Sequence, residues 1–174
     1  MFPDSFSTAR LTLRRMQVDD ARAIFDGYAQ DEEATRYLAC YPHATIDQTE
    51  SYVKMSLAAV SSRAYALVLN ATGQVIGAFE LRKTGRSKLD CGFALARPFW
   101  EQGLMLEALA EVVEWALRQP SVRRISGAAD VNNAGSIRVM EKAGLQRERV
   151  IRKWRVHPIR GAVPRDYIAF FKAW

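Results

Sequence analysis

The sequence is poor in the residues that cross-link a chain or bind metals. Its 174 residues include only two cysteines, Cys40 and Cys91, and two histidines. These are too few for a disulfide framework or for a cluster of metal ligands. We therefore expect a reducing, cytoplasmic environment and no metal ion.

Long apolar runs and targeting signals are also missing. No apolar run reaches the roughly 18 residues that a membrane-spanning helix requires. The opening residues MFPDSFSTAR lack the basic patch and apolar stretch of a secretory signal. There is no internal repeat, low-complexity tract or Pro/Gly-rich linker. With 49% apolar and 25% charged residues, the composition is that of a globular protein without a membrane partner, and it predicts a single domain over residues 1–174.

The charge balance and the absence of two common motifs narrow the class of ligand. Lys and Arg number 25 against 19 Asp and Glu, which gives a net charge of +6. This excess suggests an anionic partner, namely nucleic acid, an acidic surface or a phosphorylated small molecule. The patterns G-x-G-x-x-G and G-x-x-x-x-G-K-[ST] do not occur, which disfavours a dehydrogenase or a kinase.

The periodicity of the apolar residues predicts a mixed fold. A hairpin signal at 70–74 joins two β-rich runs, and a strand–helix–strand succession from residue 89 indicates a parallel crossover. We predict an α/β or α+β fold, a mixed sheet of about seven strands flanked by about four helices. The predicted strands are 10–15, 65–69, 75–81, 89–95, 122–129, 147–156 and 166–172. The predicted helices are 21–28, 45–59, 104–118 and 133–143, with a short helical patch at 32–38.

The helix that begins near residue 45 carries a capping signal. Thr45 and Gln48 are three residues apart, which is the spacing of a capping box. We expect Tyr52, Met55 and Ala59 to lie along one face of this helix.

The loop that ends at Gln102-Gly103 is a candidate anion site. The first turn of a helix has free N–H groups and a dipole that favours negative charge. Gly103 permits a close approach of the backbone or a positive φ. The alternative is that Gly103 only begins the helix that follows.

Three segments carry longer motifs. Residues 89–108 read LDCGFALARPFWEQGLMLEA, residues 130–145 read DVNNAGSIRVMEKAGL, and residues 8–14 read TARLTLR. The first resembles the acyl-CoA-binding segment of the GNAT N-acetyltransferase superfamily. The other two resemble D-x-x-N-x-x-S-x-R-V-x-E-K-x-G-F and T-x-R-L-x-L-R of its RimJ/RimL branch, which includes ribosomal-protein N-terminal acetyltransferases. Arg160-Gly161 and Asp166 extend the resemblance to the end of the chain.

The resemblance implies a fold and an activity. The fold is a central seven-stranded sheet that is splayed in the middle. The activity is acetyl-CoA-dependent transfer of an acetyl group to a primary amine, either a peptide N-terminus or a small amine, by direct attack in a ternary complex. The enzyme class is an acyltransferase for groups other than aminoacyl groups.

The resemblance also implies where acetyl-CoA binds. In this family the loop pattern [Q/R]-x-x-G-x-[G/A] holds the CoA pyrophosphate through backbone amides. Here Trp100 and Met105 occupy the outer positions, and Glu101 stands where many members have glycine. The implied pyrophosphate ligands are the amides of Gln102, Gly103, Leu104 and Met105.

Pantetheine is implied to add to the splayed strand at Phe93, Ala94 and Leu95. One of these amides would polarise the thioester carbonyl, as in an oxyanion hole. The alternative is that these residues pair with a neighbouring strand.

Residues at the start of the helix 133–143 are implied to contact CoA. Asn133 would bond pantetheine, Ser136 would assist the leaving thiolate, and Arg138 would reach a CoA phosphate. The alternatives are helix caps for Asn133 and Ser136 and a solvated surface position for Arg138. Many superfamily members carry a tyrosine acid at the position of Met140, so Ser136 or water would have to serve.

Transfer to an amine requires a neutral nucleophile and therefore a base. Asp90 occupies the strand position where this branch commonly has Glu, and Glu80 or a water molecule is the alternative base. A salt bridge from Asp90 to Lys88 or Arg82 would instead be structural.

The acceptor pocket is implied to form around 37–43 and 155–165. His43 is a candidate lining residue, whereas we expect His157 to be exposed. The identity of the amine stays open, as does the choice between monomer and homodimer.

Two rival functions remain. The first is a nucleic-acid or ribosome-surface binder that uses the basic C-terminal third, although no recognition helix or aromatic RNA-binding signature accompanies it. The second is a GNAT fold that binds CoA without catalysis, which Glu101, Met105 and Met140 suggest. The basic residues that the first rival function would use are Arg147, Arg149, Arg152, Lys153, Arg155, Arg160 and Arg165.

Overall fold

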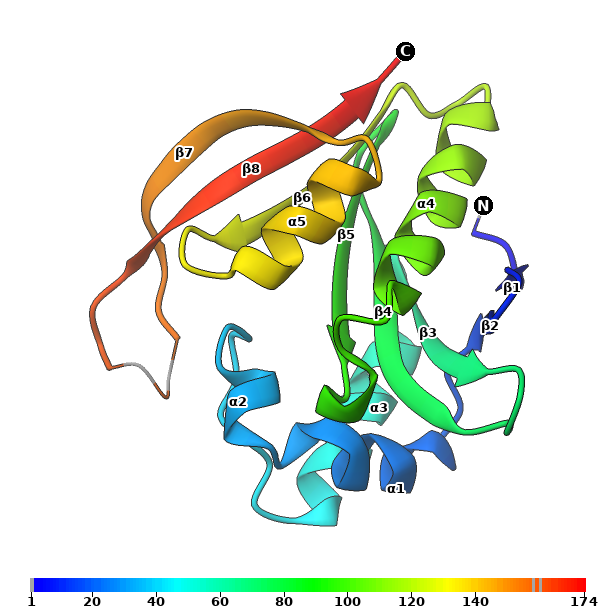
Figure 1. Ribbon diagram of the computed structural model, residues 1–174, viewed down its shortest axis with the longest axis vertical. Helices are drawn as coiled ribbons and strands as arrows, with labels where there is room; N and C mark the ends of the chain where they lie inside the picture. The colour runs from blue at the N-terminus through cyan, green and yellow to red at the C-terminus, as the bar shows by residue number, and fades with distance from the viewer. Residues whose placement is uncertain (1, 158, 160) are drawn as a thin grey trace.

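The computed structural model describes residues 2–157, 159 and 161–174. Within them, eight strands form one mixed sheet in the order β1-β2-β3-β4-β5-β6-β8-β7 (Figure 1). The predicted fold class is confirmed. The strands are β1 (Ser5–Ser7), β2 (Leu11–Arg15), β3 (Ser62–Leu69), β4 (Val75–Gly85), β5 (Lys88–Leu95), β6 (Arg124–Asp130), β7 (Gln146–Arg155) and β8 (Arg165–Ala173).

Helices cover both faces of this sheet. One apolar cluster joins α4 and α5 to the strands, and a second joins α1 and α3 to the other face. Figure 1 shows α4 and α5 together on the near face. The helices are α1 (Asp20–Ile24), which continues as a π-helical turn (Phe25–Ala29), α2 (Glu32–Thr35), α3 (Ile46–Ala58), α4 (Leu104–Arg118) and α5 (Ala134–Lys142).

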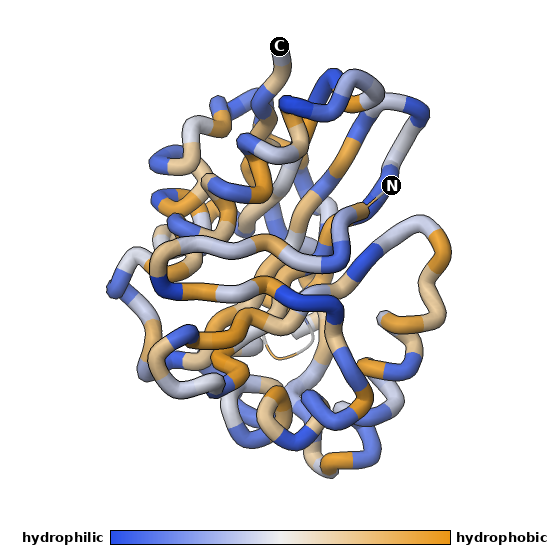
Figure 2. The backbone as a smooth tube through the Cα atoms, turned by 90° about the vertical axis from the view of Figure 1, so that its right-hand side faces the viewer, coloured by the Kyte–Doolittle hydropathy of each residue, from blue (hydrophilic) through white to orange (hydrophobic). Residues whose placement is uncertain are grey.

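The connections match the predicted topology. Strands β3, β4 and β5 form an antiparallel meander, and β5, α4 and β6 form the parallel crossover. The inward face of α4 is buried as its periodicity predicts. In Figure 2 hydrophobic and hydrophilic residues alternate along much of the backbone, as expected for elements with one buried and one exposed side. No helix in the described part of the chain is both long and apolar enough to cross a membrane.

The predicted start of α3 is confirmed, but its capping box and the burial of its apolar residues differ from the prediction. Thr45 is the N-cap residue, but its side chain makes no capping hydrogen bond. The Gln48 side chain instead accepts the backbone N–H of Ala44 at 2.7 Å. Met55 is 70% exposed, because the helix turns Thr49 and Val53 toward the sheet instead.

Two short elements also differ from prediction. The three-residue β1 was not predicted and pairs with β2 at the edge of the sheet. The helical patch 32–38 is only the four-residue α2. Both elements are too short for apolar periodicity to show in the sequence.

The sheet is splayed between β5 and β6, as the resemblance implied. Their parallel pairing runs only from Lys88–Arg124 to Cys91–Gly127. Beyond this point β5 still pairs with β4 as far as Leu95. On the other side β6 still pairs with β8 as far as Asp130. The two halves of the sheet therefore separate at Gly92 and leave one edge of β5 open.

Candidate active site

A cavity of about 1000 Å³ lies where β5 and β6 separate. Its wall includes the end of β5, the loop before α4, the first turn of α5 and the segment around α2. Of the site residues predicted from the sequence, only Gln102 does not line it. The predicted residues that do are Asp90, Phe93, Ala94, Leu95, Gly103, Leu104, Met105, Asn133, Ser136 and Arg138.

The open edge of β5 presents backbone groups to this cavity. The N–H of Ala96 donates to Ile76 O at 2.9 Å, on the β4 side. Since backbone groups alternate in direction along an antiparallel strand, Ala94 also faces β4, whereas Phe93 and Leu95 face the gap. The indole N–H of Trp100 donates to Leu95 O at 2.7 Å. The groups left for a ligand at this edge are therefore those of Phe93 and the N–H of Leu95.

The loop before α4 is shaped by two left-handed residues. Gly103, the N-cap residue of α4, has a φ of 75°, and Glu101 has a φ of 60°. The N–H of Glu107 donates to Gly103 O at 3.0 Å as the first bond of the helix. The N–H groups of Leu104 and Met105 thus have no partner within the helix. Gly103 therefore both begins the helix and uses the positive φ that glycine permits, and the arrangement leaves donors that an anion can use.

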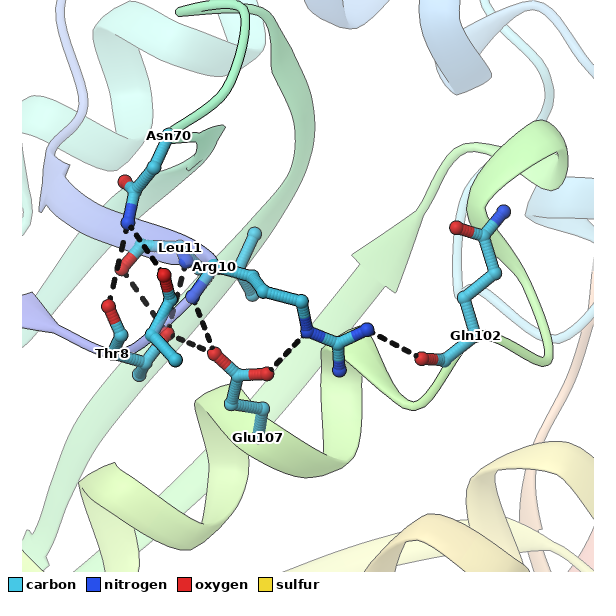
Figure 3. A network of polar contacts seen from close by, with 7 residues as sticks. Thr8, Arg10, Leu11, Asn70, Gln102 and Glu107 are labelled. Carbon is cyan, nitrogen blue, oxygen red and sulfur yellow. Dashed lines mark hydrogen bonds and ion pairs between the residues drawn. The ribbon is translucent and has the colours of Figure 1, made fainter.

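A polar network from the N-terminal strand region holds this loop in place (Figure 3). The Arg10 guanidinium bonds Glu107 Oε2 at 2.7 Å and Gln102 O at 3.0 Å. The backbone N–H of Arg10 donates to Glu107 Oε1, and the Thr8 hydroxyl donates to the same atom. Gln102 thus contributes its carbonyl to the support of the loop. Arg10, in the T-x-R start of the sequence, thus supports the loop before α4, called the anion loop below, 92 residues further along the chain.

Replacing Glu107 by glutamine is expected to lower the free energy of unfolding at neutral pH by about 1 kcal/mol. Partial burial raises the pKa of Glu107, but hydrogen bonds from Thr8 and Arg10 lower it more. A carboxylate whose folded pKa is depressed stabilises above its unfolded pKa, and this contribution is lost as the pH falls through the folded pKa. Urea unfolding at neutral pH and in acid should therefore separate wild type from variant only at neutral pH.

The control for this prediction is Glu111→Gln, one turn further along α4. Within the described chain Glu111 makes no ion pair, so its replacement should change stability by less than about 0.5 kcal/mol. A loss in Glu107→Gln that is equal in acid and at neutral pH would contradict the electrostatic explanation.

The first turn of α5 combines capping with a position on the cavity. Asn133 Oδ1 accepts the N–H of Ser136 at 3.1 Å, so the predicted capping role of Asn133 is confirmed. The Ser136 hydroxyl has no hydrogen-bond partner among the described residues, and Arg138 is exposed. Met140 is 2% exposed and belongs to the apolar core.

Both candidate carboxylate bases share one arginine. Arg82 Nη1 lies 2.8 Å from Glu80 Oε2, and Arg82 Nη2 lies 2.5 Å from Asp90 Oδ2. Burial lowers the pKa of Arg82, but its bonds to Asp90 and Glu80 raise it overall. A Cβ on Gly92 would lie 3.2 Å from both Arg82 Nη atoms, so the glycine leaves room for the guanidinium. The predicted alternative of an Asp90–Arg82 salt bridge is confirmed.

A model of the "Acetyltransferase (GNAT) domain" family matches residues 10–146. The chain belongs to the GNAT acetyltransferase family. The "Uncharacterized N-acetyltransferase p20" of Bacillus licheniformis is 26% identical over 157 residues, which cover 87% of each chain. This GNAT enzyme is therefore an N-acetyltransferase.

Solved structures show the same fold. A putative acetyltransferase from T. thermophilus has a TM-score of 0.86 and 26% identity, covering 99% of this chain and 90% of its own. The microcin C7 self-immunity acetyltransferase MccE, solved with acetyl-CoA and AMP, has a TM-score of 0.87, 15% identity and coverages of 99% and 98%. The ribosomal-protein-S5-alanine acetyltransferase of Vibrio fischeri has a TM-score of 0.81, 17% identity and coverages of 97% and 96%. At these last two identities the likeness concerns the fold alone.

The wall of the GNAT cavity opposite β5 contains a buried polar cluster that sequence reasoning missed. His157 is fully buried, so its predicted exposure is wrong. Its Nε2 lies 3.1 Å from Asp130 Oδ2 and 2.9 Å from the Tyr167 hydroxyl, and its Nδ1 lies 3.1 Å from Leu38 O. Arg165 also bonds Asp130 Oδ2. These contacts join the ends of β6, β7 and β8 to the segment after α2, and this closure of the wall explains the burial of His157.

Aromatic side chains line the part of the cavity near α1 and α3. Burial raises the pKa of Tyr28, and the nearby Tyr52 adds to this effect. Burial likewise raises the pKa of Tyr52, and the charge of Glu80 contributes. His43 lines the same region, where burial lowers its pKa. Its Nδ1 lies 2.8 Å from Thr49 Oγ1. Tyr28, Tyr52 and His43 thus stay neutral near neutral pH and add uncharged polar groups to this end of the cavity.

Three of the five described arginines in the basic C-terminal set are ion-paired in the structure. Arg147 pairs with Glu141, Arg152 with Asp166 and Arg165 with Asp130. Arg160, part of the sequence resemblance and of the predicted acceptor region, lies outside the described residues. No group of three or more His, Cys, Asp or Glu side chains in the described chain is arranged to hold a metal ion.

Proposed function

We propose that this GNAT enzyme is a RimJ/RimL-type N-acetyltransferase that transfers the acetyl group of acetyl-CoA to a primary amine. The acceptor is a peptide N-terminus or a small amine. One observation carries the proposal: the free amides at the start of α4 and the open edge of β5 line the same cavity. A cytoplasmic location belongs to the proposal and is supported by the two free cysteines, Cys40 and Cys91.

The residues at the cavity fit the two polar parts of acetyl-CoA. The amides of Gly103, Leu104 and Met105 suit the pyrophosphate, because donors and helix dipole act together there. The exposed Arg138 adds a positive charge on the same cavity. The outward groups of Phe93 and Leu95 suit the amides of pantetheine, as an added strand would. Asn133 is positioned to contribute, although its Oδ1 already accepts one N–H.

The proposed reaction is a direct transfer. The amine nitrogen forms a bond to the thioester carbonyl carbon, the carbon–sulfur bond breaks, and CoA leaves as a thiolate. The N–H of Phe93 or Leu95 stabilises the oxyanion. The attacking amine gives up one proton to Asp90 or Glu80, directly or through water, and the thiolate gains one from Ser136 or water.

Two features support the RimJ/RimL assignment. The T-x-R-L-x-L-R start has a structural role here, because Arg10 ties the anion loop to Glu107. The Vibrio fischeri enzyme named for alanine of ribosomal protein S5 shares the fold over 97% of this chain.

The candidate bases favour an α-amino acceptor. An α-amino group with a pKa of about 8 needs a weaker base than a lysine at about 10.4. Glu80 and Asp90, the carboxylates that Arg82 bonds, therefore suit an α-amino group better than a lysine.

The direct test is thiol release from acetyl-CoA in the presence of an acceptor panel. The panel contains short peptides with different N-terminal residues, lysine-containing peptides with blocked N-termini, and small polyamines. We expect release with at least one class, and reduced turnover in Ser136→Ala and Asp90→Asn. Asp47→Asn, on the exposed first turn of α3, is the matched control. Binding of acetyl-CoA without turnover on any acceptor would contradict the proposal and favour a GNAT fold without catalysis.

Replacing Glu101 by glycine is expected to strengthen acetyl-CoA binding about threefold. Glu101 is exposed on the anion loop with a φ of 60°, and it brings a negative charge to the proposed pyrophosphate site. Glycine removes this charge and adopts the left-handed backbone without strain. Isothermal titration calorimetry with acetyl-CoA measures the change.

Glu101→Gln separates the two effects. It removes the charge but keeps a side chain in the left-handed conformation, so the affinity gain should persist. Only the glycine variant should also gain stability, about 0.5 kcal/mol. Unchanged affinity in both variants would show that Glu101 does not act on the ligand.

A further inference from the structure

A second pocket, of about 530 Å³, lies at the far end of α4 from the GNAT site. It is lined by Trp115 and Gln119 near the end of α4 and by Lys88 and Leu89 at the start of β5. The 15 residues of α4 span about 22 Å. Among the described lining residues the two cavities share only Ala64, so this pocket is a hollow of its own that adjoins the acetyl-CoA cavity at that residue.

The lining of this basic pocket has one sign of charge. Five cationic side chains and no acidic one are among the lining residues that the structure describes. They come from the end of β2, the start of β3, the end of β4, the turn after it and the start of β5. They are Arg15, Arg63, Lys83, Arg86 and Lys88.

Most of this charge is not neutralised within the protein. Arg63 pairs with Asp4, and Lys88 acts electrostatically on Glu148. Within the described chain, Arg15, Lys83 and Arg86 form no ion pair. In the C-terminal set, by contrast, three arginines each pair with a carboxylate. Part of the net charge of +6 is thus gathered, uncompensated, around one hollow.

The form of the pocket indicates the size of its ligand. The cations converge on a hollow whose volume lies in the range of small-molecule sites. A nucleic acid would instead need a stripe of cations along its backbone. Serine hydroxyls at Ser62, Ser87 and Ser121 line the same hollow and can donate hydrogen bonds.

We propose that the basic pocket binds a small molecule with two or more phosphate groups, independently of acetyl-CoA. Phosphate is favoured over carboxylate because each group carries more negative charge and three acceptor oxygens. Arginine and lysine bind such oxygens through charge-assisted hydrogen bonds. The site is distinct from the proposed acetyl-transfer function and does not rest on it.

Calorimetric titration with inorganic tripolyphosphate tests this proposal. The protein is first saturated with CoA, so that the anion loop at α4 is occupied. We expect saturable binding to one further site, weakened by added salt. The double variant Lys83→Gln/Arg86→Gln should bind at least about tenfold more weakly. Citrate, a tricarboxylate, should also bind at least about tenfold more weakly to the unaltered protein.

A matched double variant controls for net charge. Arg22→Gln/Arg149→Gln removes the same charge from exposed positions outside the pocket and should keep the affinity within about twofold. Circular dichroism confirms folding of both variants. No binding in the presence of CoA, equal loss in both variants, or equal affinity for citrate would overturn the proposal. A short single-stranded RNA that binds more tightly at Lys83 and Arg86 than tripolyphosphate does would also overturn it.

Discussion

Replacing Gly77 by alanine is expected to lower the free energy of unfolding by about 3 kcal/mol. Gly77 lies in β4 opposite Leu95 of β5. A Cβ at this position would lie 2.4 Å from Ala94 O and 3.2 Å from Leu95 Cα. Both are backbone atoms, so the overlap is relieved only if the two strands move apart. Urea unfolding of the purified variant measures the loss.

The same substitution should also weaken acetyl-CoA binding, because Leu95 belongs to the open edge of β5. Gly27→Ala is the matched control. A Cβ at Gly27 would meet only Ala96 Cβ, at an ordinary 3.8 Å, and alanine is a better helix former than glycine by up to about 1 kcal/mol. Equal stability of Gly77→Ala and wild type would contradict the close approach of β4 to β5.

The parts of the fold that depend on local pattern were predictable from the sequence. The turn at 70–74 joins β3 and β4 because Gly73 takes a φ of 73° there. The apolar stripe of α4 identified both the helix and its buried face. Strand–helix–strand succession then left the right-handed crossover as the usual arrangement for β5, α4 and β6.

Features set by contacts between distant segments were not predictable. Nothing in the run Val75-Ile76-Gly77 shows that β5 approaches one residue more closely than its neighbours. His157 follows a strand and has a loop-like sequence context, yet the Leu38 carbonyl and Asp130 enclose it. Such burial depends on segments 119 and 27 residues away.

The candidate site, too, was predictable where it depends on local motifs and not where it depends on contacts between distant segments. The resemblance led to the anion loop and the open strand, because both are short motifs in one stretch of sequence. The sequence offered Lys88 or Arg82 as the salt-bridge partner of Asp90, and the register of β4 and β5 selects Arg82, which lies directly opposite Asp90. Asp130 and Tyr167 also oppose each other, across β6 and β8. Their pairing depends on a return of the chain that no local signal marks.

Replacing Arg82 by methionine is expected to have the largest effect on the chemistry of the site. Glu80 and Asp90, diagonal neighbours across β4 and β5, would then lack the cation that now bonds both. Breaking a fully buried ion pair costs about 3 to 5 kcal/mol, and we expect about 2 kcal/mol here because water reaches these side chains. Without the cation, the two negative charges also repel each other in the folded variant.

The direction in which the stability loss of Arg82→Met changes with pH provides the test. In the variant, the repulsion destabilises the fold while both carboxylates are charged, and this penalty disappears when acid removes one of the charges. Urea unfolding should thus show a larger loss for Arg82→Met in mildly alkaline solution than in mild acid. If Asp90 or Glu80 accepts the proton of the amine, the acid limb of the kcat/KM profile should also move to higher pH. Arg82→Lys should show both shifts to a smaller extent, and Arg118→Met, at an exposed ion pair, should show neither. A loss of stability that does not depend on pH would reduce the role of Arg82 to packing.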